Sequence, residues 1–382
     1  MKCVLADIAD VTMGQSPKSE YYNSEKNGMP FLQGNRTFGK KYPTFDTYTT
    51  FITKTAKSGD VIMSVRAPVG DVNITPIDMC LGRGVCGIRM KNENQEFLFY
   101  LLKYYMPRLV NKQSGTVFGS VNKNDINSLE IDIPEDSTIQ RKIARYLSMI
   151  DEKIELNEKI NKNLEQQISA LFRNMFGFNI DNLTESKFKL GDLVESVDNR
   201  GKTPPLSDKP TSYPIIDVKA LSGNVRIIDY SKCTKYVDEE TYNNWFRSGH
   251  PKQYDVLIST VGTLAEMKIF LGDVGCIAQN VVGFRSKGIS PLYLYQYLNY
   301  IKSDLVAYNI GSVQPSIKVT HIIKHSIYVA PQEEIEKFDS VARSFTEKIF
   351  INCQESENLK QLRDAFLPRL MSGELDVVDI DL

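Results

Sequence analysis

The side chains of this 382-residue chain that could act as catalytic groups occur in spacings that complete no recognisable site. Enzymes that methylate the amino groups of DNA bases use a loop of the type Asn/Asp-Pro-Pro-aromatic. The nearest string here, Thr203-Pro204-Pro205-Leu206, lacks both the first and the last residue type. The sequence also has no GxxxxGK[ST] loop to bind nucleotide phosphates. We therefore expect a chain without catalytic activity.

Metal and cofactor sites are equally weak in the sequence. His321 and His325 have a spacing that could bind a metal on a helix, but the equivalent positions in the first half are Asp125 and Leu129. The six cysteines show no CxxC pair, which favours reduced, buried thiols over zinc ligands. The string Gly82-Arg83-Gly84 is too short for a cofactor loop. It favours a backbone turn that exposes polar side chains, and we expect this chain to bind neither metal nor cofactor.

The elements that would position such side chains occur twice, about 195 residues apart. Each half has a buried strand beginning with aspartate, then a glycine- or amide-containing turn, an aromatic helical segment, a glycine loop and an apolar strand that ends in proline. The paired segments are residues 59–65 and 254–260, 81–89 and 277–285, 97–102 and 292–298, 113–116 and 309–312, and 133–134 and 330–331. A duplication of this length predicts two similar α/β domains.

Two long amphipathic helices follow the two copies. Apolar residues recur every three or four positions over about 37 residues, which gives a length of roughly 55 Å and indicates a pair of antiparallel coiled-coil spacers. Charged residues between these positions, such as Glu152 and Glu165, suit the solvent side. The residues that define the predicted seam are Ile143, Ile150, Ile154, Asn157 and Leu164 in the first helix, and Phe345, Ile349, Asn352, Leu359 and Phe366 in the second.

Each seam contains one asparagine near its midpoint, Asn157 and Asn352. If the helices pair about a pseudo-two-fold axis, the two amides should meet near that axis, although each could equally be a half-exposed seam residue. A pair of long helices would hold the two similar domains at a fixed distance from each other. Duplex DNA presents recognition sites about 34 Å apart per helical turn, so a two-part DNA site is the natural target.

Several strings resemble the specificity subunit of type I restriction-modification systems. Residues 12–23 and 28–34 resemble the opening of a target-recognition domain of that family, and residues 201–204 with 213–216 are their counterpart in the second half. Residues 362–375 resemble the end of the family's second helical spacer. The resemblance covers essentially the whole chain and depends on the order of the strings together with the duplication.

This resemblance implies an α/β (α+β) fold in which two similar target-recognition domains are joined by the two helices in a circular arrangement. We expect domain boundaries at residues 1–136 and 178–331, with spacers at 137–177 and 332–382. The resemblance further implies that the chain recognises a bipartite, asymmetric site on double-stranded DNA. It would recruit two adenine-N6 methyltransferase subunits, which would bind S-adenosylmethionine, and in a full complex also two restriction/translocase subunits.

Candidate DNA contacts lie in the loops of both halves, since base edges need donors and acceptors while phosphates need cations and backbone amides. In the first domain they are Gln15, Ser16, Lys18, Tyr21, Gln33, Asn35, Arg36, Arg66, Arg83, Ser114, Thr116 and Lys123. In the second they are Arg200, Lys202, Thr203, Lys219, Thr263, Gln279, Asn280, Ser312, Gln314 and Lys318. Any one of them could also be an ordinary solvated loop residue.

A formal net charge of −1 gives no bulk attraction to phosphates, so we expect the isolated chain to bind DNA weakly and the assembled complex to bind tightly. The sequence lacks a signal peptide and a membrane span, which favours the cytoplasm. One alternative is a scaffold whose duplicated domains bind protein or polysaccharide through aromatic residues. Another is a self-sufficient nuclease, for which no carboxylate and lysine cluster is evident.

Overall fold

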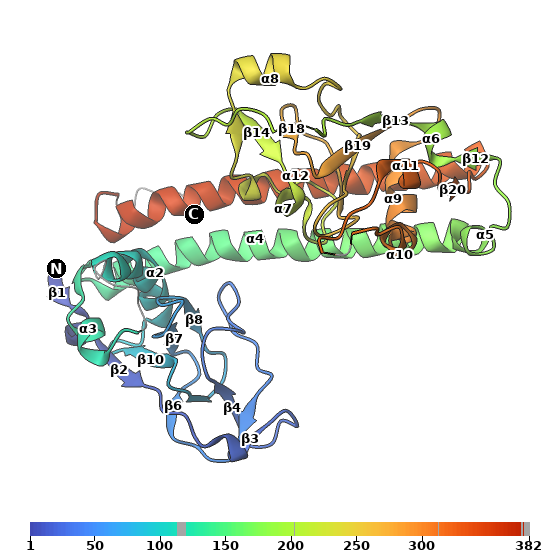
Figure 1. Cartoon of the computed structure of the whole chain (residues 1–382). Coiled ribbons are helices and arrows are strands. Elements are labelled where there is room, and N and C mark those ends of the chain that lie inside the picture. The colour runs from blue at the N-terminus through green and yellow to red at the C-terminus, as the bar shows by residue number, and fades with distance from the viewer. Residues whose placement is uncertain (113–119, 202, 312, 376, 378–382) are drawn as a thin grey trace. The chain divides into compact units, whose positions relative to one another are not determined.

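The computed structural model describes the chain except residues 113–119, 202, 312, 376 and 378–382. It divides into two compact units: Met1–Ile154 with Asn358–Leu382, called unit 1, and Glu155–Glu357, called unit 2. The helices α4 (Ser137–Phe172) and α12 (Gln332–Met371) each contribute a segment to both units (Figure 1). No helix among the described residues is long and apolar enough to cross a membrane.

The recognition fold of unit 1 is built from short strands and few helices. Its four-stranded antiparallel sheet has the order β2-β10-β7-β8, and a second sheet has the order β3-β5-β4-β9-β6. The elements are β1 (Lys2–Val4), α1 (Leu5–Ile8), β2 (Ala9–Met13), β3 (Tyr22–Asn23), β4 (Met29–Leu32), β5 (Tyr48–Thr49), β6 (Lys54–Ala56), β7 (Val61–Ser64), β8 (Val72–Ile74), β9 (Met79–Leu81), β10 (Val85–Met90), α2 (Gln95–Lys112), α3 (Lys123–Asn127) and β11 (Glu130–Asp132).

Unit 2 repeats this plan with one sheet of order β13-β19-β16-β17 and a smaller one of order β15-β14-β18. The duplicated α/β architecture predicted from the sequence is therefore present. The elements are α5 (Phe178–Asp181), β12 (Phe188–Lys189), α6 (Leu190–Leu193), β13 (Val194–Val197), β14 (Tyr213–Ile216), α7 (Val218–Leu221), β15 (Tyr236–Val237), α8 (Glu239–Trp245), β16 (Val256–Ser259), β17 (Met267–Ile269), β18 (Cys276–Ile277), β19 (Val281–Ser286), α9 (Pro291–Tyr300), α10 (Lys302–Ala307), α11 (Val319–Ile322) and β20 (Ser326–Ile327).

In each four-stranded sheet, one of the two central strands, β7 in unit 1 and β16 in unit 2, is buried on both faces because it separates two apolar cores. In β7, Val61 and Met63 point into the core that contains α2, whereas Ile62 points into the core beneath the second sheet. In β16, Val256 and Leu257 divide in the same way. Alternate residues of a strand face opposite sides, so a continuous apolar run is what a sheet between two layers requires. The second sheet is thereby fixed as the outer layer of each unit.

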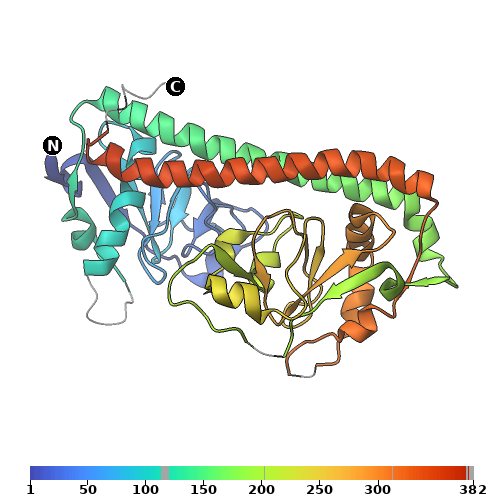
Figure 2. The ribbon, with the colours of Figure 1, turned by 90° about the horizontal axis from the view of Figure 1, so that it is seen from above.

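The helices α4 and α12 pack against each other antiparallel within each unit (Figure 2). In unit 1, the ring of Tyr146 of α4 packs at a tilt against Phe366 of α12, with 5.8 Å between the ring centroids. In unit 2, Phe172 near the end of α4 contacts Phe338 near the start of α12. The helices contain 36 and 40 residues, and their seam residues are buried or half-buried. This pairing provides each recognition fold with a rigid support.

The central asparagines of the two seams are both buried, but their amides do not bond to each other. Asn157 Nδ2 donates to Glu355 Oε2 at 2.8 Å and lies 3.5 Å from the backbone oxygen of Asn352. Asn352 Nδ2 instead donates to Asn161 Oδ1 at 2.8 Å. The two asparagines therefore meet in the seam as predicted, but through the backbone of Asn352, while both side chains also bond to residues one helical turn away.

Candidate DNA-reading loops

The two outer sheets each contain one parallel strand pair, and its register defines equivalent positions in the two units. Leu32 of β4 lies opposite Leu81 of β9. Ile216 of β14 lies opposite Ile277 of β18. A three-residue loop follows each second strand: the β9–β10 loop, residues 82–84, and the β18–β19 loop, residues 278–280. By this register Arg83 in unit 1 corresponds to Gln279 in unit 2.

Equivalent backbone hydrogen bonds anchor the two loops at their first and third residues. The first loop residue donates to the neighbouring parallel strand: Gly82 N to Leu32 O at 2.8 Å, and Ala278 N to Ile216 O at 3.0 Å. The third loop residue accepts a hydrogen bond from the residue that follows β7 or β16: Gly84 O from Val65 N at 2.9 Å, and Asn280 O from Thr260 N at 2.8 Å. The two loops thus share these anchoring hydrogen bonds but carry different side chains.

In unit 1, three strands end beside this loop and surround a surface pocket of about 570 Å³. Ser16, which follows β2, accepts a hydrogen bond from Arg83 N at 3.0 Å and donates one to Gln33 Oε1 at 3.1 Å. The hydroxyl of Tyr22 lies 3.5 Å from the same Gln33 oxygen. Three predicted site residues, Ser16, Gln33 and Arg83, are therefore in contact. Tyr22, which was not predicted, also lines the pocket.

In unit 2, the equivalent place is lined differently. Gln279 Nε2 donates to Thr203 Oγ1 at 2.9 Å, so these two predicted residues are in contact. Asp217 stands where unit 1 has Gln33, since each follows its parallel strand directly. Its carboxylate accepts from Lys219 N at 2.9 Å and caps α7, which directs it toward the backbone. The same scaffold position thus offers different hydrogen-bonding groups in the two units.

Several predicted cationic contacts are already paired with carboxylates. Arg36 donates twice to Asp46, at 2.7 and 2.8 Å, and these hydrogen bonds lower the pKa of Asp46. Burial alone would raise the pKa of Asp198, but hydrogen bonds from Arg200 bring it below its usual value. These arginines would have to leave their carboxylates before they could bind phosphate.

Two other arginines are exposed and available. Neither Arg66 nor Arg83 has a side-chain partner within the described part of the chain, and both are exposed. Arg66 lies in the turn after β7, and this turn is repeated in unit 2: Ser64 Oγ donates to Pro68 O at 2.8 Å, and Ser259 Oγ donates to Thr263 O at 2.6 Å. A free guanidinium on a fixed backbone is well suited to a ligand with acceptor groups.

The remaining predicted contacts are scattered over both surfaces. Asn35 Nδ2 is held by Asp71 Oδ2 at 2.5 Å, and Tyr21 stacks on Phe51 at 5.2 Å. Gln15, Lys18 and Lys123 are exposed in unit 1, as are Lys219, Thr263, Gln314 and Lys318 in unit 2, whereas Asn280 is half-buried. Ser114, Thr116, Lys202 and Ser312 lie outside the described residues.

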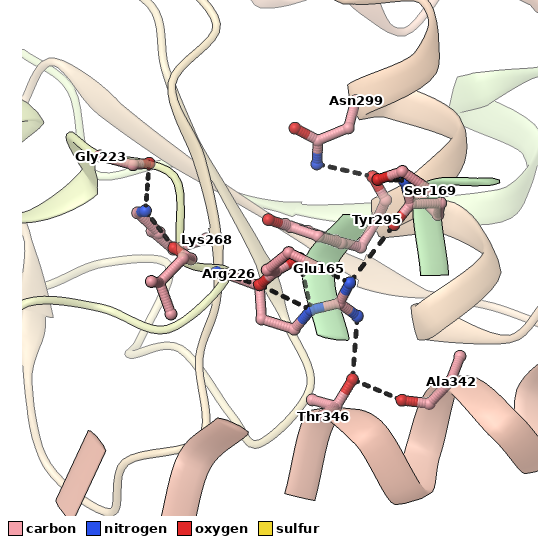
Figure 3. Close-up of polar contacts among 11 residues, drawn as sticks. Glu165, Ser169, Gly223, Arg226, Lys268, Tyr295, Asn299, Ala342 and Thr346 are labelled. Carbon is pink, nitrogen blue, oxygen red and sulfur yellow. Dashed lines mark hydrogen bonds and ion pairs between the residues drawn. The ribbon is translucent and has the colours of Figure 1, made fainter. Parts of the chain in front are cut away.

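A buried charged network in unit 2 ties the recognition fold to the helix pair (Figure 3). Arg226, which is 0% exposed, donates from its backbone N and its guanidinium to Glu165 of α4, with the shortest guanidinium contact at 2.8 Å. Its Nη1 donates to Thr346 Oγ1 of α12 at 2.9 Å. Glu165 was expected to face solvent, and this expectation is wrong because a buried arginine takes both of its oxygens. The only signal in the sequence is an arginine within an apolar run.

Unit 1 has its own attachment to the helices, made by different residues. Tyr100 of α2 donates to Asp151 Oδ2 of α4 at 2.8 Å, and Arg363 Nη1 of α12 donates to the other oxygen at 2.7 Å. Lys41 Nζ donates to Ser148 Oγ at 2.9 Å and to Glu96 Oε1 at 2.7 Å. Each recognition fold is therefore fixed by polar contacts to the helix segments of its own unit.

Comparisons with known proteins agree over nearly the whole chain. A family model described as a type I restriction modification DNA specificity domain matches residues 1–166 and 184–361. A protein of Methanocaldococcus jannaschii, provisionally named the MjaX specificity subunit of a type I restriction enzyme, is 42% identical over 158 residues. That match covers 41% of this chain and 37% of that protein.

Two further relatives match over a greater length. The MjaIX specificity subunit of a type I restriction enzyme from the same organism is 23% identical, covering 98% of this chain and 93% of that protein. The crystal structure of the S subunit of a type I restriction-modification system from M. genitalium is 17% identical with a TM-score of 0.61, covering 97% of this chain and 96% of that one. At this level of identity the structural match shows a shared fold.

Proposed function

The chain belongs to the type I restriction-modification DNA specificity family, and from that premise we propose that each unit reads one half of a bipartite, asymmetric site on double-stranded DNA. The observation that supports this most strongly is the pair of matched loops. Residues 82–84 and 278–280 share equivalent backbone hydrogen bonds at their first and third residues but present different side chains. Equal scaffolds with unequal side chains are what a site with two different halves requires.

We further propose that the chemistry belongs to partner subunits. Two adenine-N6 methyltransferase subunits that hold S-adenosylmethionine would assemble on the helix pair, and two restriction/translocase subunits could join them. Methylation of adenine requires the base to leave the helical stack, which an enzyme with a suitable pocket must accomplish. This chain would act in the cytoplasm, where it would recognise the DNA site and bind the partner subunits at that site.

Selection from a randomised DNA library tests the proposal. The purified chain together with its methyltransferase partner should enrich sequences that contain two defined blocks of different sequence separated by an undefined spacer. The chain alone should bind weakly, because its net charge of −1 provides little attraction to phosphate. Enrichment of a single block, or none, would contradict recognition by two units. Tight site-specific binding by the chain alone would contradict the role given to the partners.

A further inference from the structure

We propose that Arg83 and Gln279 are specificity-determining residues, and that Arg83 reads a guanine in one half-site while Gln279 reads an adenine in the other. The two residues occupy the same position of the two scaffolds, as the register of the parallel strand pairs shows. The inference rests on the proposed function, in which each unit reads a half-site. Beyond that function, the inference assigns one base-reading residue to each half-site and names the base that it recognises.

The backbone on both sides of Arg83 is fixed. Gly82 N donates to Leu32 O at 2.8 Å, and Gly84 N donates to Gln33 O at 3.0 Å. The amide of Arg83 itself donates to Ser16 Oγ at 3.0 Å. Since the loop is held at all three residues, only the side chain remains to be ordered by a ligand. A group held in this way loses little entropy on binding, which favours specific contact.

The side chains that unit 1 leaves free beside this loop present donors, because Asp46, the carboxylate of the pocket lining, is already bound by Arg36. The guanidinium of Arg83 is exposed and has no ion-pair partner among the residues that the structure describes. The serine hydroxyl engages Gln33 Oε1, so the free part of that carboxamide is its NH₂ group. Guanine offers two acceptors, O6 and N7, on its major-groove edge, whereas adenine offers one acceptor and one donor. A donor-lined place therefore favours guanine, because the N6 donor of adenine would have no acceptor opposite it.

Gln279 presents a different combination. One N–H of its carboxamide donates to Thr203 Oγ1 at 2.9 Å. Its Oε1 has no donor among the described residues, and one N–H also remains. One acceptor beside one donor matches adenine, whose N6 donates and whose N7 accepts. The contact with Thr203 also restricts rotation of the carboxamide, which fixes the order of acceptor and donor.

Exchange of the two side chains tests the inference. Complexes with R83Q or Q279R would be expressed with an unchanged methyltransferase partner in cells that lack adenine methylation, and the methylated sites would be mapped beside those of the wild type. R83Q should weaken the preference for guanine at one position of one half-site by roughly 10-fold to 100-fold. Q279R should replace adenine by guanine at one position of the other half-site. Arg83 is exposed and Gln279 is half-buried, and neither belongs to an apolar core, so the fold should be retained.

Each variant is the control for the other, because each should leave the opposite half-site unchanged. If R83Q and Q279R leave both half-sites as in the wild type, the inference is wrong. If either variant lowers methylation evenly while the motif is kept, the residue contacts phosphate and the inference is wrong for it. A wild type that gives no split motif dependent on this chain would refute the proposed function itself, a result distinct from the other two.

Discussion

Gly84 lies where the backbone of the β9–β10 loop passes closest to Gln33. A Cβ at this position would lie 2.3 Å from Gln33 O, and its own N–H donates to the same oxygen. Gly84→Ala should therefore push the loop away from Gln33, reduce the stability of unit 1 by roughly 1–3 kcal/mol, and weaken recognition of one half-site. Library selection with the variant complex, together with thermal denaturation, measures both effects.

Gly34 provides the matched control for this change. It is the next residue after Gln33, and a Cβ there would meet no atom within 4 Å. Gly34→Ala should leave both the stability and the selected DNA sequence as they are. Equal effects of the two substitutions would show that the loop has room to adjust, and the close approach at Gly84 would then not define the reading position.

Lys268 is a buried cation whose titration should be visible in the stability of unit 2. It is 2% exposed, and its Nζ donates to the backbone oxygens of Gly223 and Val225. Burial lowers the pKa of Lys268 to about 8, against about 10.4 in an unfolded chain. Between these pH values the unfolded chain holds a proton that the folded chain has released, so the contribution of Lys268 to the free energy of unfolding rises with pH.

The difference in free energy of unfolding between the wild type and Lys268→Met should accordingly increase by roughly 1–3 kcal/mol from pH 8 to pH 10.4. Taking the difference removes the titration of all other groups. Denaturant unfolding can be followed by the fluorescence of Trp245, the only tryptophan, which lies in unit 2. A difference that stays constant over this range would show that Lys268 keeps its proton in the folded chain, and the lowered pKa would then be wrong.

At the scale of elements, the Arg226 network decides how firmly the recognition fold of unit 2 is held on α4 and α12. Arg226→Met should destabilise unit 2 by about 3–5 kcal/mol, because Glu165 would keep its charge in a largely buried place without a partner. Arg226→Met with Glu165→Met should recover much of that loss, since neither charge remains. Urea unfolding followed by Trp245 fluorescence measures both; equal losses in the single and double variants would mean that Glu165 is solvated.

The elements themselves were largely predictable, and the reason is periodicity. The three-to-four spacing of apolar residues predicts α4 and α12, and the repeated strand and turn strings predict two similar α/β folds. Pairings between side chains were not predictable. The side chains of Asn157 and Asn352 bond to Glu355 and Asn161 rather than to each other, and Arg226 binds Glu165 from a distant part of the chain. Such contacts depend on register and depth of burial, which a sequence pattern does not contain.

The candidate site was predictable only as a set of polar loop residues. The sequence has Arg83 and Gln279 at aligned positions, but their equivalence depends on strand register and shared backbone hydrogen bonds. The sequence likewise gives no sign that Arg36 is paired with Asp46 while Arg83 is not. Which cation is free depends on the three-dimensional neighbours of each side chain, and these come from separate strands.

At the scale of the whole molecule, the length of the two helices should set the spacing of the DNA half-sites. Seven residues inserted in α4 after Ile154 and seven in α12 before Asn358, at the boundaries of the two units, would preserve the seam and lengthen each helix by roughly 10 Å. The undefined spacer in the methylated motif should grow by about three base pairs, at roughly 3.4 Å per base pair. An unchanged spacer, with both half-sites intact, would show that the helices do not determine it.

The most direct test of recognition by two units is a map of N6-methyladenine in cells that otherwise lack it. The chain would be expressed with its methyltransferase partner, and the partner alone would be the comparison. The account predicts methylation at a split motif with two different halves, present only when this chain is expressed. Methylation at an unsplit motif, or at the same motif without this chain, would contradict the account.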